Sequence, residues 1–206
     1  MTDRAVALVL TAAGAASRDA GAGLFPGVPL EALTREQLRP LAPFEGRLFE
    51  LLGELPRGGV VGLVVPVLAA GGAAVPPLPC GSSPGPACSP APGELVPIAD
   101  HVNLEACGPL TGRWPVGVPR VFPSMTGIYQ PMLVRPPRGP RVYSFGVVAA
   151  GVAAARRLTP YEARAVREGA WSIVSDSLVR VAIVAAYHGL RLAACGSVQA
   201  PTDDRE

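Results

Sequence analysis

The sequence predicts a single-domain α/β fold with a mixed central β-sheet flanked by helices. Apolar runs of strand length alternate with helix-like segments along the chain, which is the pattern of α/β domains. The run at 60–68 is apolar throughout, as expected of a strand covered on both faces. Hydrophobic residues make up 49% of the 206 positions, enough for one sizeable core. We therefore expect residues 1–206 to form one domain.

The N-terminal half carries the weaker patterns. The expected elements are, in chain order, a strand at 6–10, a helix at 30–41, a strand at 46–55 and a strand at 60–68. The helix is expected because Thr34 and Gln37 have the spacing of a capping box. The last two strands are separated by a glycine-containing turn at 56–59.

The C-terminal half carries the clearer patterns. The expected elements are strands at 94–99, 142–148 and 190–198, a helix that begins at Thr159, and a helix at 177–188. Thr159 is followed by Pro160 and by Glu162, which suits the first turn of a helix. Gly189 stands where a left-handed residue would end the other helix.

Two segments are expected to lack regular structure. Residues 70–93 are rich in Gly, Pro, Ser and Ala without periodicity, which indicates a flexible loop. Residues 200–206 are expected to be a disordered tail. With 24 glycines and 24 prolines, the chain as a whole has room for long connections.

Charge and composition exclude several classes of function. The net charge of +2 gives no electrostatic case for binding nucleic acid. No apolar stretch is long enough to cross a membrane, and no clear signal peptide precedes the first strand, so a cytoplasmic protein is expected. All 18 basic residues are Arg, which is typical of a GC-rich genome and excludes lysine Schiff-base chemistry.

Metal and cofactor sites are not expected. The four cysteines have no CxxC spacing, and the two histidines do not complete a zinc pattern. Cys195 lies in an apolar strand and is expected in the core.

Two blocks of sequence carry a family signature. The first reads GELVPIADHVNL at 93–104, GPLTG at 108–112 and VFPSMTGIY at 121–129. The second reads LTPYE at 158–162, SDSLV at 175–179 and VAAYHGLR at 184–191. In order and spacing these resemble the GDxMxIxDHINL, NPLxG, RFPxMSxAY, ETPAE, GMSTV and VARHxGLR segments of the trimeric purine nucleoside phosphorylases. The resemblance implies a phosphorylase-like fold and a trimer.

The same resemblance implies a phosphorolysis site, in which phosphate attacks the anomeric carbon while a purine departs. Most of the family's binding residues are replaced. Among the phosphate-binding segments, the phosphate-loop serine falls on Ala12, the Arg and His of GRFHxYEG fall within 65–72, and TNAAGG falls near 80–85. On the nucleoside side, the Phe and Glu of FET fall on Arg157 and Leu158, the Asn of TN falls on Ala200, and the Met of GMS falls on Asp176. Only the serine of the last motif remains, as Ser177.

Two segments of the family pattern are short or absent. The stretch between Tyr129 and Tyr143 is shorter than in the family, and the sequence given stops soon after Gln199. We therefore expect the family's long C-terminal helix to be missing and the pocket to be shallow and wet.

Several residues have a functional and a structural interpretation. Asp176, Ser177 and Arg157 either form a new polar substrate site or are polar surface residues that the missing C-terminal helix leaves uncovered. His101, beside Asp100, is catalytic or has a structural role. These interpretations stay open from the sequence alone.

Two further residues are interpreted in the same way. Phe122 reaches into a neighbouring subunit's pocket, as its counterpart does in the family, or it is a core residue. His188 is expected to cap a helix, with a partly charged imidazole that suits the helix dipole.

Three functions are compatible with these patterns. The first is a phosphorylase-like protein that has lost phosphorolysis and assembles as a homotrimer, or with a related chain. The second is a repurposed enzyme of bacterial specialised metabolism, with a small-molecule ligand in a more apolar pocket that includes Leu158. The third is residual nucleoside cleavage. Fold alone does not decide among them, because function resides in the site.

Overall fold

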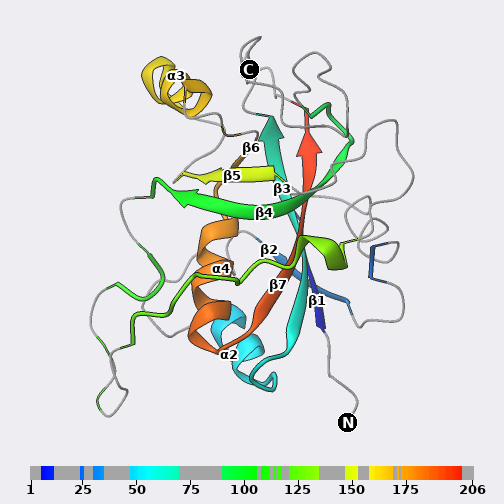
Figure 1. Cartoon of the computed structure of the whole chain (residues 1–206), viewed down its shortest axis with the longest axis vertical. Coiled ribbons are helices and arrows are strands. Elements are labelled where there is room, and N and C mark those ends of the chain that lie inside the picture. The colour runs from blue at the N-terminus through cyan, green and yellow to red at the C-terminus, as the bar shows by residue number, and fades with distance from the viewer. Residues whose placement is uncertain are drawn as a thin grey trace.

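The protein is a mixed α/β structure. The computed structural model describes residues 6–11, 24–25, 30–34, 47–69, 90–105, 108–111, 114, 116, 121–134, 147–152, 158–168, 171 and 173–200. Its elements are β1 (Val6–Thr11), β2 (Leu30–Thr34), α2 (Arg47–Gly53), β3 (Val60–Ala69), β4 (Leu95–Asn103), η1 (Pro131–Leu133), β5 (Val147–Gly151), α3 (Pro160–Glu168), β6 (Ile173–Ser175), α4 (Leu178–Tyr187) and β7 (Arg191–Gln199). Figure 1 shows their arrangement.

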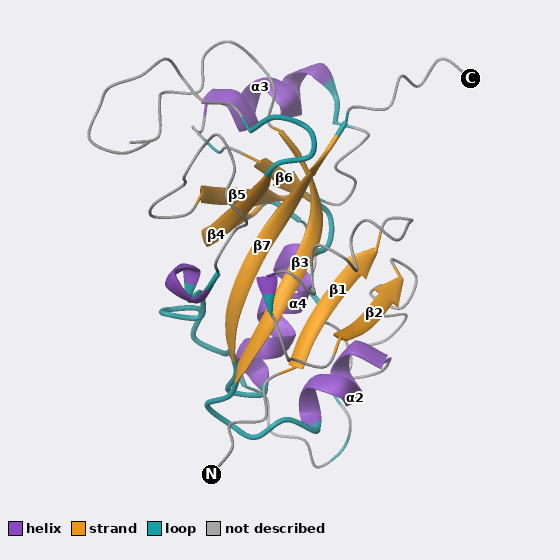
Figure 2. Ribbon diagram, turned by 90° about the vertical axis from the view of Figure 1, so that its right-hand side faces the viewer, coloured by secondary structure: helices purple, strands orange, loops and turns teal. Residues whose placement is uncertain are grey.

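The sheet closes on itself. Its strands run in the order β2-β1-β3-β6-β5-β4-β7, and a further pairing joins β3 to β7. The five strands β3, β6, β5, β4 and β7 therefore form a ring, while β1 and β2 extend from β3 outside it (Figure 2). The pairing that closes the ring is parallel and runs from Val60 with Arg191 to Leu68 with Gln199. A closed sheet hides the edges that an open sheet leaves unpaired.

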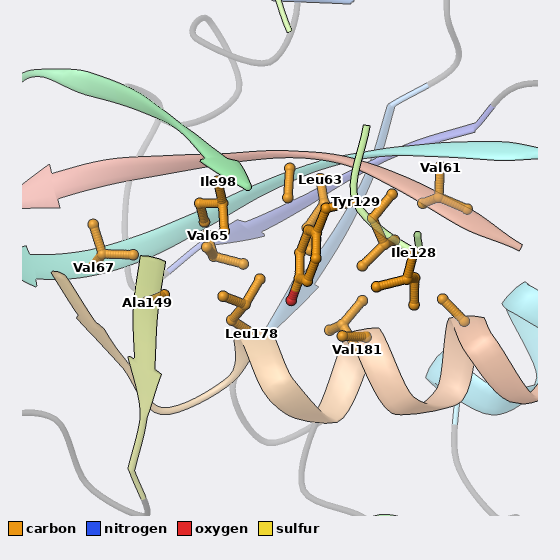
Figure 3. Close-up of a cluster of buried hydrophobic side chains, with 14 of the residues drawn as sticks. Val61, Leu63, Val65, Val67, Ile98, Ile128, Tyr129, Ala149, Leu178 and Val181 are labelled. Carbon is orange, nitrogen blue, oxygen red and sulfur yellow. The ribbon is translucent and has the colours of Figure 1, made fainter. Parts of the chain in front are cut away.

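The main core lies between this ring and α4. Side chains of β3 and β4, including Leu63, Val65 and Ile98, face Leu178 and Val181 of α4 (Figure 3). All five side chains are fully buried. Dense aliphatic packing of this kind is what fixes a helix against a sheet.

The cap residues of α3 and α4 agree with the sequence patterns. Thr159 and Glu162 form the expected capping box, in which the Thr159 amide donates to Glu162 Oε2 at 2.8 Å and the Glu162 amide donates to Thr159 Oγ1 at 3.3 Å. Ser177 and His188 are the residues that flank α4, and Gly189 follows with a φ of 70°. These two helices are confirmed.

The expected helix at 30–41 is wrong where the structure describes it. Residues 30–34 form β2, which pairs in parallel with β1 from Ala7 with Leu30 to Thr11 with Thr34. Five consecutive pairings outweighed the local capping pattern, as tertiary contacts often do. Residues 35–41 lie outside the described part.

The expected strand at 46–55 is also wrong. Residues 47–53 form α2, whose buried side chains Leu48, Leu51 and Leu52 have the i, i+3, i+4 spacing of one helix face. Phe49 of this helix stacks at a tilt on Tyr187 of α4, with 5.4 Å between ring centroids. The apolar residues of this segment repeat with a helical period and not in the alternation of a strand, which is why they form one buried helix face.

Two strand boundaries differ from expectation, and one strand was not expected. β4 continues to Asn103, beyond the expected end at 99, and β5 begins at Val147, near the end of the segment expected to be a strand. β6 was not predicted, because three residues are too few to show a period.

Several expectations concern residues that the structure does not describe. They include the phosphate-loop position Ala12, the loop at 70–89, residues 135–146, Arg157 and the tail after Ala200. Within the described residues, no helix is long and apolar enough to span a bilayer.

Candidate functional site

Three parallel strands end side by side at one edge of the ring. Asn103 of β4 pairs with Gly151 of β5, and Gly151 pairs with Ser175 of β6. Because the carboxyl ends of parallel strands are where open α/β proteins bind ligands, this edge is the candidate site. The chain that leaves β6 runs at once into α4, so the first turn of that helix belongs to the same edge.

The first amide groups of α4 are hydrogen-bonded within the chain. Ser175 Oγ accepts from the amides of Ser177, at 3.4 Å, and Leu178, at 3.2 Å. The Ser177 hydroxyl donates to Asp176 Oδ1 at 3.2 Å, and the Ser177 residue is only 3% exposed. Two of the donors that this helix start would offer to an anion, the amides of Ser177 and Leu178, are thus engaged by Ser175.

A buried ion pair lies beside this helix turn. Arg180 Nε donates to Glu105 Oε2 at 3.0 Å, with the glutamate side chain 1% exposed and the arginine side chain 19% exposed. Burial raises the pKa of Glu105, the bond and charge of Arg180 act against that rise, and the charge of Asp176 adds to it. Burial, the largest cause, disfavours the ionised form of this carboxyl.

The described charges beside the start of α4 are two acids and one base. Of the described side chains discussed here, Glu105 and Asp176 carry carboxylates, and Arg180 alone carries a positive charge that is already bonded to Glu105. A phosphate at the start of α4 would therefore lie near two carboxylates, one of which is bonded to Arg180. Such like-charge contacts cost free energy in a partly desolvated site.

The structure places some of the sequence candidates here and others elsewhere. Asp176 and Ser177 lie together at the start of α4, while Arg157 lies outside the described residues. Leu158 is partly buried and packs against the small apolar cluster of Ala150, Val152, Val166 and Val174. That cluster lies beneath α3, so Leu158 contributes to packing there.

Glu105 and Arg180 were not predicted from the sequence. Glu105 follows the expected strand of 94–99 by several residues, and its strand proved longer. Arg180 stands in the first turn of the expected helix, and nothing in its local sequence sets it apart. The signal was an acidic residue just past a parallel strand together with a basic residue on the adjoining helix, and only the strand register brings them into contact.

His101 has a buried polar partner. Its Nδ1 lies 2.7 Å from the Tyr129 hydroxyl, and the two rings meet edge to face. A register irregularity between Ile98 and Asp100 precedes it in β4. Burial lowers the pKa of His101, and the charge of Asp100 opposes this, whereas burial raises the pKa of Tyr129. A neutral imidazole that accepts from a tyrosine favours the structural interpretation of His101.

Phe122 is not a core residue. It is 94% exposed, so the interpretation that placed it in the core is wrong. Cys195 is a buried free thiol, as expected of a core position, and burial raises its pKa to about 12. Among the described residues, no group of three or more His, Cys, Asp or Glu side chains is placed to hold a metal ion.

His188 caps α4 as expected, but its surroundings disfavour the expected partial charge. Its ring packs on Phe49 with 4.6 Å between centroids, and Nε2 is buried without a hydrogen-bond partner among the described residues. Burial lowers the pKa of His188, a backbone bond to Phe49 acts in the opposite sense, and the charge of Arg57 lowers it further. The imidazole is therefore mainly neutral near neutral pH.

Protonation of His188 is expected to destabilise the fold. Because its folded pKa lies below the unfolded value of 6.5, the unfolded chain binds the proton first as the pH falls through 6.5. The free energy of unfolding should decrease by up to about 1.4 kcal/mol per pH unit in that window. Urea denaturation from about pH 7.5 to about pH 5.5 measures this slope, and His188→Gln should flatten it. Equal slopes in the two proteins would contradict the assignment.

The comparisons with known proteins give similar solved structures among the purine nucleoside phosphorylases. No family model and no curated protein matches the chain. It is similar to purine nucleoside phosphorylase from Schistosoma mansoni complexed with a monocyclic inhibitor, with a TM-score of 0.47, 14% identity, and 68% of this chain and 50% of that chain covered. For the Schistosoma mansoni enzyme in complex with inosine, the TM-score is 0.45 and the identity 14%, with 71% of this chain and 50% of that chain covered.

A purine nucleoside phosphorylase in complex with ribose-1-phosphate gives a TM-score of 0.46, 15% identity, and coverage of 71% of this chain and 52% of that chain. The chain spans about half the length of the phosphorylases it matches. A likeness at this level assigns no role to any residue, so the roles below are argued from sequence and geometry.

Proposed function

We propose that this chain is a purine nucleoside phosphorylase-like protein that does not carry out phosphorolysis. The observation that carries the proposal is the internally bonded start of α4. Ser177, the serine that the resemblance retains from the GMSTV segment, is 3% exposed and donates to Asp176, and its amide donates to Ser175. Phosphate binding would require breaking these bonds beside two carboxylates.

A second position supports the proposal. The resemblance places the family's phosphate-binding Arg and His within residues 65–72. In this chain Val65 and Val67 of that segment are 0% and 1% exposed and belong to the main core. Losing charge-assisted donors to phosphate removes roughly 1.5–3 kcal/mol of binding free energy for each bond.

The position expected to bind the purine is also altered in a way that disfavours phosphorolysis. Leu158 stands where the resemblance places the base-binding glutamate, and it packs against apolar side chains. A leucine accepts no hydrogen bond from a purine N–H, so the departing base would lack its stabilising partner.

The direct test is an assay of inosine cleavage in phosphate buffer, coupled to detection of hypoxanthine. We expect no release above the rate without protein, while an active trimeric phosphorylase assayed in parallel gives a clear signal. Calorimetric titration with inorganic phosphate should show no saturable heat. Release of hypoxanthine that depends on phosphate would refute the proposal.

Assembly is the second part of this proposal. Phe122 is a large apolar side chain that is 94% exposed, and the resemblance places its counterpart in a neighbouring subunit's pocket. We propose a homotrimer, or a mixed assembly with a related chain, in which Phe122 contacts the neighbour.

Sedimentation velocity measures the assembly directly. A trimer is expected, and Phe122→Arg is expected to shift the distribution toward monomer. Tyr161→Arg, at another exposed aromatic position on α3, is the matched control and should leave the distribution unchanged. A monomeric parent protein would rule out self-assembly.

A repurposed enzyme is the alternative that one observation favours. Asp176 and Ser177 form a hydrogen-bonded acid and hydroxyl at a strand edge, next to an apolar cluster that contains Leu158. Comparison of small-molecule profiles from cells with the parent chain, Asp176→Ala and Ser177→Ala tests it. Identical profiles would count against an enzyme.

A further inference from the structure

Two segments of the chain share the side of β7 that is opposite to β3. β7 pairs with β3 along its whole length, and on its other side β4 pairs with it only as far as Pro97. Beyond that point Tyr129 forms an isolated parallel bridge with Leu192. Leu192 donates to the Ile128 carbonyl and accepts from the Gln130 amide, both at 2.7 Å. The short segment around Tyr129 therefore pairs with the part of β7 that β4 leaves.

A side-chain hydrogen bond joins these two neighbours of β7. The register of β4 is irregular between Ile98 and Asp100, where β4 leaves β7 and continues beside β5. His101 follows at once, and its Nδ1 lies 2.7 Å from the Tyr129 hydroxyl, with 5.6 Å between the ring centroids. The bond therefore connects Tyr129 to β4 at the place where β4 and β7 separate.

Both partners of this bond are neutral near neutral pH. Tyr129 is 8% exposed, and Figure 3 shows its ring among apolar side chains of the main core. Burial raises the pKa of Tyr129, and the charge of Asp100 adds to the rise. Burial lowers the pKa of His101, and the charge of Asp100 opposes this. The tyrosine O–H therefore donates to an unprotonated Nδ1.

Protonation of His101 disrupts this arrangement. Both ring nitrogens of a protonated imidazole are donors, so the tyrosine oxygen would have to accept, and its buried O–H would need a new acceptor. Burial also disfavours the imidazolium charge. Because the closed arrangement favours the neutral ring, its stability is complete above about pH 6.5 and decreases as the pH falls below that value.

The charged groups of the adjoining elements compensate little for an imidazolium. Asp100, on the same strand, is exposed, and its effect is smaller than that of burial. The segment 121–134 and β5 contain no charged residue. Arg191 of β7 and Arg180 of α4 are cations themselves. Glu105, beyond the end of β4, is bonded to Arg180.

The chain between Phe122 and Tyr129 forms a compact turn. Met125 packs against the main core, the Ile128 amide donates to the Met125 carbonyl at 3.3 Å, and Gly127 has a φ of 71°. A change in how Tyr129 is held therefore reaches Phe122, which is 94% exposed.

We propose that the contact of His101 with Tyr129 is a pH switch that holds the segment 121–134 on β7 and, through it, fixes the position of Phe122. His101 acts through Tyr129 and not on a ligand. The effect on Phe122 rests on the homotrimer proposed above, whereas the contact between the two side chains does not.

The first test is an NMR titration of the imidazole Cε1 protons in the full chain. The chain has two histidines, so His188→Gln assigns both signals. We expect His101 to be half-protonated below pH 6.5, its ordinary value. A midpoint at or above 6.5 would overturn the proposal.

Hydrogen exchange measures whether protonation loosens the segment. In the His188→Gln protein, where His101 is the remaining histidine, the protection factor of the Leu192 amide should fall by up to about tenfold per pH unit below about pH 6.5. The Gly93 amide, which donates to Val198 at the other end of β7, is the reference and should change less. Equal changes at both amides, or none at Leu192, would contradict the switch.

Substitutions locate the effect. His101→Gln keeps an acceptor for the tyrosine O–H without a titrating group, so the protection of Leu192 should no longer depend on pH in this range. If that variant does not fold, Tyr129→Phe removes the bond and should lower the protection several-fold at about pH 7.5. Tyr161→Phe, at an exposed position on α3, is the matched control and should leave it unchanged. Equal protection in the two Phe variants would rule the contact out.

Sedimentation velocity separates the switch from the assembly on which it acts. The parent trimer should shift toward monomer between about pH 7.5 and about pH 5.5, and His101→Gln should shift less. A parent that is monomeric at the higher pH would contradict the proposed assembly. A trimer that responds to pH equally in the two proteins would overturn the switch.

Discussion

Leu63→Ala is expected to lower the free energy of unfolding by about 2–5 kcal/mol. Leu63 is fully buried in β3, which pairs with both β1 and β7 at this point. Strands on both sides hold the backbone in place, so the cavity left by the side chain cannot collapse easily. Urea denaturation of the parent and the variant measures the difference.

Two controls separate cavity formation from a general effect of substitution. Leu63→Met keeps most of the volume and should cost less than about 1.5 kcal/mol. Leu133→Ala removes the same atoms from a side chain that is 53% exposed, and it should stay within about 0.5 kcal/mol of the parent. A loss at Leu133 equal to that at Leu63 would contradict the placement of the core.

Gly151→Ala is expected to be the second most damaging change. A Cβ at this position would lie 2.1 Å from Val179 Cγ2, well inside the contact distance of two carbon atoms. Val179 is 1% exposed and belongs to α4, so the clash moves the helix or distorts the end of β5. Such overpacking costs about 1–3 kcal/mol, and more where nothing can yield.

The consequence should extend to the candidate site, because Gly151 pairs with both Asn103 and Ser175 at the carboxyl edge. Thermal unfolding measures the loss of stability. Gly108→Ala is the matched control, since its added Cβ would meet Ile183 at an ordinary 3.5 Å. If Gly151→Ala were as stable as Gly108→Ala, the close approach of α4 to β5 would be wrong.

Patterns with strong periodicity or local capping were predictable from the sequence. The helix of residues 178–187 shows both, and Thr159 with Glu162 forms the bonds that the spacing implies. Segments decided by distant partners were not predictable. Residues 30–34 carry a helix-start pattern and yet pair with β1 along their whole length.

The candidate site divides in the same way. Asp176 and Ser177 were identified because they fall on the GMSTV segment of the sequence resemblance. Glu105 and Arg180 were not, because their contact depends on the true end of β4 and on the register that brings β4, β5 and β6 together. A pair separated by so many residues leaves no local pattern to read.

The pairing of β3 with β7 also has a consequence for how the chain reaches its native state. Val60 pairs with Arg191, which lies far along the chain, and the pairing of β4 with β7 also depends on this last strand. Contacts between such distant residues raise the contact order, and proteins of high contact order fold slowly because loop closure is entropically costly. During synthesis, β3 therefore leaves the ribosome long before β7 does, so the edge of β3 that pairs with β7 stays unpaired until the last strand arrives.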